Sequence, residues 1–250
     1  MTDMSLLCVH AHPDDEALWT GGLLARSAEA GGRTGVVTCT WAEGTRRAAE
    51  LERSLDILGA GKPRLLGYAD ARVPESAPGS PRFCDAPLEE SVGRLVAHLR
   101  EFRPDAVITY DGYGGYGHPD HVHAHRVTLA AVEAAGYAQL YPEAGAPWRP
   151  RALYLATVPR SAVLALWPQV FGGQPDPDQP LPGVPDAEIS TTVDVRRWHE
   201  RKWAAFAAHE SEAERGAGPA VFASLPEETR QRLLGTEWYI RRGHADELLA

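Results

Sequence analysis

The 250-residue chain has few sulfur-containing residues, with three cysteines and two methionines. The cysteines stand far apart at Cys8, Cys39 and Cys84, and no two have the spacing of a Cys-rich zinc site. An odd number without a regular spacing argues against a disulfide-stapled secreted domain and favours a reducing, cytoplasmic location. A chain of this length buries a large core of its own, so it needs no disulfides for stability.

Long apolar runs and an excess of basic charge are also missing. The first apolar run, residues 6–9, is too short for a signal peptide or a membrane span, and no basic residue precedes it. Lys and Arg number 25 against 34 Asp and Glu, which gives a net charge of −9 and argues against a nucleic-acid partner. We therefore expect a soluble protein with a small-molecule partner and no membrane association. Monomer and homo-oligomer both stay open.

Apolar runs alternate with helical patterns along the chain. We expect strands at residues 6–9, 33–40, 63–66, 106–110, 153–158 and 189–193. We expect helices at residues 14–29, 45–58, 88–102, 120–135 and 195–209. This alternation predicts βαβ units, and hence an α/β Rossmann-like fold with a mostly parallel sheet and helices on both faces.

We interpret residues 1–250 as a single domain in two parts. Residues 1–135 form the core and carry the polar motifs described below. Residues 136–250 form a C-terminal part that includes a Pro-rich segment, residues 172–186, and ends in a polar tail after residue 209. A long segment of this composition is more typical of a functional loop than of a domain linker, so we expect 172–186 to be a loop or lid.

Two clusters of His and Asp follow two of the expected strands. Residues 12–16 read His-Pro-Asp-Asp-Glu directly after the first strand, and residues 118–121 read His-Pro-Asp-His after the strand at 106–110. Ligands of open parallel sheets bind beyond the carboxyl ends of the strands, so we expect the two clusters to meet there. Imidazole and carboxylate are ligands that zinc accepts. The pair of clusters therefore predicts a metal hydrolase.

The spacing of the two clusters predicts both metal ligands and a general base, but it does not assign these roles to particular residues. A catalytic zinc needs three protein ligands, an open position for water and a nearby carboxylate as general base. Asp14 and Asp15 at a helix start would point about 100° apart, so one can bind metal while the other faces the open position. The same holds for His118 and His121, and Asp120 is a candidate for orienting a histidine.

Simpler interpretations exist for each of these residues. Asp14 and Asp15 could be only the acidic residues that favour a helix N-terminus, and residues 118–121 could be only a loop-to-helix cap. A non-catalytic sugar- or nucleotide-binding protein would instead carry a phosphate-binding GxGxxG after the first strand, where this chain has residues 12–16. The remaining histidines are interpreted as solvated or packed: His10, His98, His123, His125, His199, His209 and His244.

The motifs resemble those of the LmbE-like (PIG-L) zinc-dependent N-deacetylase family. Residues 10–16 and 118–121 are similar to its two signature motifs. Residues 47–50 resemble its Arg-x-x-Glu helix, and residues 66–70 resemble its Leu-Gly-x-x-Asp turn. Residues 110–121 are similar to the branch that contains the mycothiol-pathway deacetylase and the mycothiol S-conjugate amidase. The resemblance spans essentially the whole chain.

The resemblance implies a Rossmann-like hydrolase that removes an acyl group from the nitrogen of an N-acylated amino sugar, such as N-acetylglucosamine linked to inositol. It implies that His12, Asp15 and His121 bind zinc, which ferrous iron replaces in some members. It also implies that Arg47 and Asp70 contact sugar hydroxyls. Alternatives in the same chemistry are an amidase of thiol conjugates and a natural-product N-deacetylase.

The resemblance further implies a catalytic role for four residues beside the metal. Asp14 would be the general base for the attacking water, and His118 the general acid or oxyanion stabiliser, held by Asp120. Tyr116 would lie near the developing oxyanion. These roles rest on the match of motifs and not on the spacing of the residues.

Overall fold

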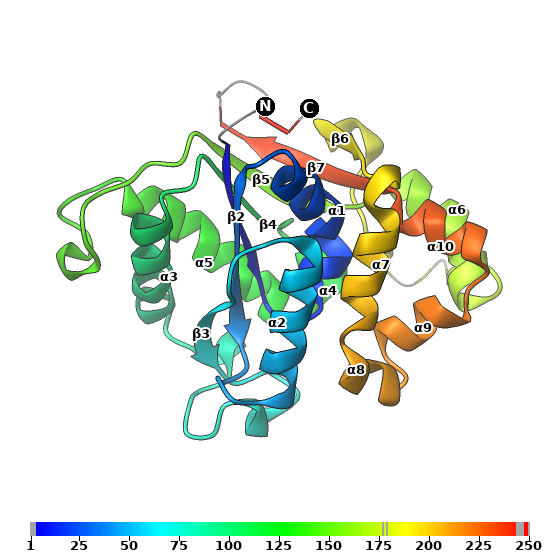
Figure 1. Ribbon diagram of the computed structural model, residues 1–250, viewed down its shortest axis with the longest axis horizontal. Coiled ribbons are helices and arrows are strands. Elements are labelled where there is room, and N and C mark those ends of the chain that lie inside the picture. The colour runs from blue at the N-terminus through cyan, green and yellow to red at the C-terminus, as the bar shows by residue number, and fades with distance from the viewer. Residues whose placement is uncertain (1–3, 177, 179, 244–247, 250) are drawn as a thin grey trace.

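Seven strands form one sheet in the computed structural model, in the order β3-β2-β1-β4-β5-β7-β6 (Figure 1). The structure describes residues 4–176, 178, 180–243 and 248–249, so His244 lies outside the described residues. The strands are β1 (Ser5–His10), β2 (Arg33–Thr40), β3 (Arg64–Tyr68), β4 (Ala106–Tyr110), β5 (Ala152–Thr157), β6 (Thr191–Asp194) and β7 (Thr236–Arg242). The helices are α1 (Asp15–Glu29), α2 (Arg46–Leu58), α3 (Leu88–Phe102), α4 (Gly114–Gly117), α5 (Pro119–Ala135), α6 (Arg160–Phe171), α7 (His199–Ala207), α8 (Glu210–Glu214), α9 (Gly218–Ser224) and α10 (Glu227–Leu234).

Five of the strands run parallel. β1 pairs in parallel with β2 on one side and β4 on the other, and β3 and β5 extend the sheet in the same direction. β7 runs antiparallel to both β5 and β6. The expected mostly parallel sheet is confirmed. The connections reverse direction between β1 and β4, and such a reversal opens the crevice in which ligands of these sheets bind.

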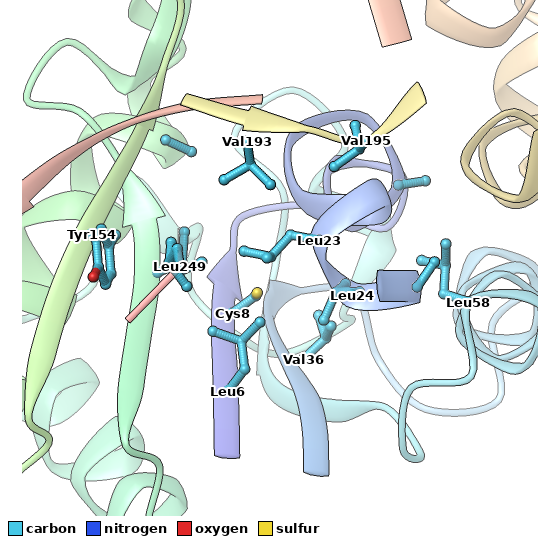
Figure 2. Close-up of a cluster of buried hydrophobic side chains, with 14 of the residues drawn as sticks. Leu6, Cys8, Leu23, Leu24, Val36, Leu58, Tyr154, Val193, Val195 and Leu249 are labelled. Atoms are coloured by element: carbon cyan, nitrogen blue, oxygen red, sulfur yellow. The ribbon is translucent and has the colours of Figure 1, made fainter. Parts of the chain in front are cut away.

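The sheet has a separate hydrophobic core on each face. Along β1, Leu6 and Cys8 face the core built with α1, α2 and α7 (Figure 2), while Leu7 and Val9 face the core built with α3 and α5. All four side chains are fully buried, as expected for a central strand whose side chains alternate between two covered faces. Helices on both faces, as expected, hold β1 and its outgoing loop rigidly in place.

The C-terminal part differs from the polar tail that we expect after residue 209. Short helices α8, α9 and α10 follow, and the chain then enters the sheet as β7 between β5 and β6. The expected helix 195–209 is shorter, because a 3-10 turn at Arg196–Trp198 precedes α7. The sequence does not predict β7, because one of the buried positions of this strand is the charged Glu237. With Tyr239 as the other buried residue, the strand lacks the alternating apolar pattern by which a strand is usually predicted. Among the described residues, no helix is both long and apolar enough to cross a membrane.

Glu237 is held by a buried ion pair with α7. The Lys202 Nζ atom lies 2.6 Å from Glu237 Oε1, and both side chains are almost fully buried. The same carboxylate accepts hydrogen bonds from the backbone N–H groups of Gly22 and Leu23 and from the Tyr239 hydroxyl. This pair therefore joins α1, α7 and β7.

We expect Lys202→Met to lower the free energy of unfolding by about 3–5 kcal/mol, because it leaves a buried carboxylate without its cation. Urea denaturation followed by circular dichroism measures the loss. The control is Lys62→Met, which removes an exposed ion pair with Glu52 and should cost less than about 1 kcal/mol. Equal losses in the two variants would contradict the prediction.

Candidate metal centre

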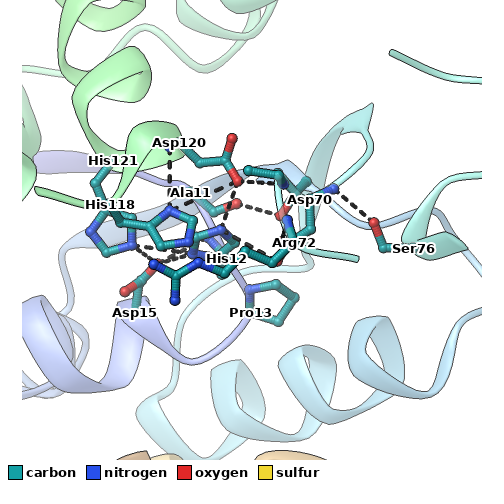
Figure 3. A network of polar contacts seen from close by, with 12 residues as sticks. Ala11, His12, Pro13, Asp15, Asp70, Arg72, Ser76, His118, Asp120 and His121 are labelled. Carbon is teal, nitrogen blue, oxygen red and sulfur yellow. Dashed lines mark hydrogen bonds and ion pairs between the residues drawn. The ribbon is translucent and has the colours of Figure 1, made fainter. Parts of the chain in front are cut away.

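The two polar clusters meet beyond the carboxyl ends of β1 and β4. His12 follows the end of β1 by two residues, and Asp15 begins α1. His121 lies in the first turn of α5, which Pro119 opens, so that its ring reaches back over the end of β4. The structure thus brings His12, Asp15 and His121 into direct contact (Figure 3).

Three atoms of these residues form a nearly equilateral triangle. His12 Nδ1 lies 3.1 Å from His121 Nε2 and 3.3 Å from Asp15 Oδ2, and His121 Nε2 lies 3.3 Å from the same oxygen. A tetrahedral metal with bonds of about 2.0–2.1 Å holds its ligand atoms about 3.3 Å apart. The triangle therefore fits one face of a metal tetrahedron. His118 lies near enough to make a second candidate group with His12 and His121.

The outer partners of both histidines leave the inner nitrogens free for a metal. His12 Nε2 lies 3.1 Å from Asp120 Oδ2 and 3.4 Å from Asp70 Oδ2, and His121 Nδ1 lies 3.1 Å from the Gly114 carbonyl oxygen. Carboxylate and carbonyl oxygens only accept, so these ring nitrogens carry hydrogens, and the opposite nitrogens can offer lone pairs to a metal once they carry no proton. Two imidazoles with such partners and one carboxylate are a donor set that suits zinc or ferrous iron.

The same carboxylates favour a charged His12 when no metal is bound. Burial alone would lower the pKa of His12, but hydrogen bonds to Asp120 and Asp15 outweigh it and raise the pKa to about 10. Metal binding must therefore displace a proton from this imidazole.

Asp120 forms a hydrogen bond with His12 through its side chain and with His118 through its backbone N–H. Its carboxylate accepts from the backbone N–H groups of Ala71 (2.9 Å) and Cys84 (3.0 Å), besides its contact with His12. It lies 3.9 Å from His118 Nδ1, which instead accepts the Asp120 backbone N–H at 3.3 Å. Asp120 thus contacts His118 mainly through its backbone N–H, while its carboxylate is fixed by three other donors, and its role in holding His118 for catalysis stays a prediction.

The side chains of Asp14 and Asp15 diverge because Asp14 has an unusual backbone conformation, and not because both lie on a helix. It lies outside α1 as the N-cap residue, with φ 120° and ψ −27°. Its Oδ2 atom faces Arg47 Nη2 at 3.2 Å, and its side chain keeps 20% exposure. Burial raises the pKa of Asp14 to about 7, with Asp15 adding to the rise and Arg47 opposing it. A carboxylate of this pKa suits a general base near neutral pH.

His12, Asp14 and Asp15 line a cavity that is open to solvent. Arg47, Asp70, Tyr116 and His118 form its wall together with Asp14. Arg47 is already engaged, since it also donates to the Pro13 carbonyl oxygen and pairs with Glu212. Its contact with a sugar, and that of Asp70, stay predictions.

The far wall of the cavity comes from residues that the sequence does not point out. It consists of Leu18, Arg72, Val73, Phe206, Glu212, Arg215, Ala217 and Gly218. Most of these lie on or between α7, α8 and α9, largely in the segment expected to be a polar tail, and no local pattern marks them. Among the described residues of 172–186, none lines the cavity, so a lid at this position stays a prediction.

Fold and site together define an α/β protein of Rossmann-like topology with a His/Asp group that could hold a metal ion at its switch point. Residues 7–132 match the family PIG-L, described as GlcNAc-PI de-N-acetylase. The chain belongs to this family, as the motifs suggest.

Curated relatives cover nearly the whole chain. A protein of Rhodococcus jostii is 40% identical over 99% of this chain and 94% of its own length. One of Streptomyces avermitilis is 36% identical over 96% of this chain and 92% of its own. Both are named 1D-myo-inositol 2-acetamido-2-deoxy-alpha-D-glucopyranoside deacetylase.

Solved structures share the fold. A conserved protein of Thermus thermophilus superposes with a TM-score of 0.68 at 26% identity, covering 98% of this chain and 97% of that one. N,N'-diacetylchitobiose deacetylase of Pyrococcus horikoshii superposes with a TM-score of 0.67 at 18% identity, covering 95% of this chain and 83% of that one. At 18% identity, the similarity to the Pyrococcus horikoshii protein shows a shared fold only.

Proposed function

We propose that this chain is a metal-dependent hydrolase that removes the acetyl group from the nitrogen of an N-acetylated amino sugar, with N-acetylglucosamine linked to inositol as its substrate. The names of the curated relatives support the reaction and the sugar. The observation that carries the proposal is the triangle of His12, Asp15 and His121 beside a separate carboxylate, Asp14, that lines the same cavity.

His12, Asp15 and His121 would hold the metal, which we propose is zinc, with ferrous iron as the alternative of similar donor preference. When bound, zinc lowers the pKa of water towards 7 and polarises the amide carbonyl. Tyr110 supports this arrangement, because its hydroxyl donates to Asp15 Oδ2 at 2.7 Å and fixes the carboxylate that faces both histidines.

Asp14 would take the proton of the attacking water, because it is a cavity carboxylate outside the triangle and directly precedes Asp15 in the chain. His118 Nδ1 accepts a backbone hydrogen bond, so the hydrogen of its neutral ring is on Nε2. That group would donate a hydrogen bond to the developing oxyanion, and the Tyr116 hydroxyl would add a second donor. The leaving amine would take its proton from Asp14, protonated by the attacking water, or from His118 in its protonated form. Arg47 and Asp70 would contact the sugar hydroxyls from the cavity wall.

An amide panel tests the proposal. It contains N-acetylglucosaminyl-inositol, free N-acetylglucosamine, N,N'-diacetylchitobiose and a cysteinyl-glucosamine thiol conjugate, each assayed by release of free amine with and without a chelator. Chelator-sensitive hydrolysis of the inositol compound with the highest kcat/KM supports the proposal. Preference for the thiol conjugate would make the chain an amidase, and no hydrolysis of any member would overturn the enzymatic function.

A further inference from the structure

Asp14 occupies a backbone conformation that needs external restraint. A non-glycine residue at φ 120° is outside the common regions and costs about 1–3 kcal/mol unless its surroundings hold it. The α1 N–H groups of Ala17 and Leu18 hold its carbonyl oxygen, and the buried carboxylate of Glu16 holds its N–H, which Oε2 accepts at 2.8 Å. The direction of the Asp14 side chain into the cavity therefore depends on where Glu16 is held.

Glu16 is held by partners from two other parts of the chain. Its Oε1 atom accepts from Ser54 Oγ on α2 at 2.5 Å and from His209 Nε2, just before α8, at 2.8 Å. All three side chains are fully buried, and none lines the cavity. A carboxylate buried in this way is stable only with such charge-assisted partners, so removing His209 frees Glu16 to move towards water.

The same segment of chain also reaches the Asp14 side chain. Arg47 joins Asp14 Oδ2 at 3.2 Å to Glu212 Oε1 at 2.9 Å. The Glu212 backbone N–H in turn donates to the His209 carbonyl oxygen at 3.1 Å. Residues 209–212 thus restrain Asp14 in two ways. His209 acts on its backbone through Glu16, and Glu212 acts on its carboxylate through Arg47.

We propose that Glu16 and His209 are positioning residues for Asp14, and that they couple the C-terminal segment beginning at α8 to the general base. Neither side chain has a hydrogen bond to the triangle atoms or lines the cavity, so we expect neither to set metal affinity or substrate binding directly. The inference rests on the proposed function for its kinetic readout.

Kinetics of His209→Ala test the inference. We expect kcat to fall about 10–100-fold through misplacement of the base, with KM and bound metal unchanged. His209→Gln places an amide N–H where Nε2 donates to Glu16, so it should restore most of kcat. Lys202→Met, which also removes a buried donor to a carboxylate, should lower stability but leave the kcat of the folded protein intact. If His209→Ala changed kcat no more than Lys202→Met does, the inference would be overturned.

A double-mutant comparison separates positioning of Asp14 from a general structural effect. In the Asp14→Asn background, His209→Ala should change the residual rate less than about twofold, because the base on which it acts is already lost. The same fold loss in both backgrounds would overturn the inference. If His209→Ala does not fold, Ser54→Ala removes the other partner of the same oxygen and permits the same comparison.

A crystal structure of His209→Ala distinguishes this inference from the proposed function. The inference predicts that Asp14 leaves its positive φ or that its carboxylate turns from the cavity, whether or not any amide is hydrolysed. An unchanged Asp14 would overturn the inference while leaving the proposed function standing. An inactive parent chain would overturn the function alone.

Discussion

Asp14→Asn is expected to lower kcat by about 10²–10⁴-fold while the chain keeps its metal, the usual scale for loss of a general base. Asn is nearly isosteric and tolerates positive φ, so the backbone at φ 120° stays accessible to it. Its amide oxygen can still accept from Arg47, which lies 3.2 Å from the carboxylate. The change removes the negative charge that faces Arg47 and, with it, the ability to accept a proton from water.

Steady-state kinetics together with metal analysis check this expectation. The control is Asp56→Asn on the exposed side of α2, which makes the same chemical change far from the cavity and should leave kcat unchanged. Near-full activity of Asp14→Asn would remove this residue from the role of base. Loss of metal in the variant would instead show that Asp14 is a ligand.

His121→Ala is expected to lose both the bound metal and at least about 10³-fold in kcat, because several kcal/mol of transition-state stabilisation depend on the metal. Its Nε2 atom supplies one corner of the triangle, and its ring is fully buried between Tyr110 and the other site residues. Two remaining donors hold a divalent ion far more weakly than three. Elemental analysis after gel filtration measures the ratio of metal to chain.

His98→Ala on α3 is the matched control, since this partly buried histidine contacts Arg64 far from the site and should leave the metal ratio unchanged. Added zinc should restore part of the activity of His121→Ala if the loss is one of affinity. Full retention of metal by His121→Ala would contradict the ligand set and favour His12 with His118 as the core of the site.

The positions of the residues in the proposed metal triangle can be predicted because their signals are local. Each His/Asp cluster directly follows an apolar strand, and parallel strands bring their carboxyl ends to one edge. His12 and His121 therefore meet although 109 positions separate them. The alternating strands and helices of residues 5–135 are visible for the same reason, since each element has its own periodicity.

The rest of the site cannot be predicted because its signals are not local. Glu212 and Arg215 look like surface residues of a polar stretch, and only the packing of α7 and α8 against α1 and α2 brings them to the cavity. The sequence predicts a helical backbone for Asp14, because acidic residues after Pro13 are typical of a helix start. Its positive φ depends on Glu16 and His209, whose contact spans 193 positions.

The place of β7 has a consequence for how the protein is made. Among the described strands, β6 pairs with the sheet only through β7, so residues 191–194 have none of these neighbours until residues 236–242 have left the ribosome. The parallel strands β1–β5 can assemble earlier, since their partners precede them in synthesis. A nascent chain stalled before β7 would thus expose the outer edge of β5, and we expect chaperones to engage it during that interval.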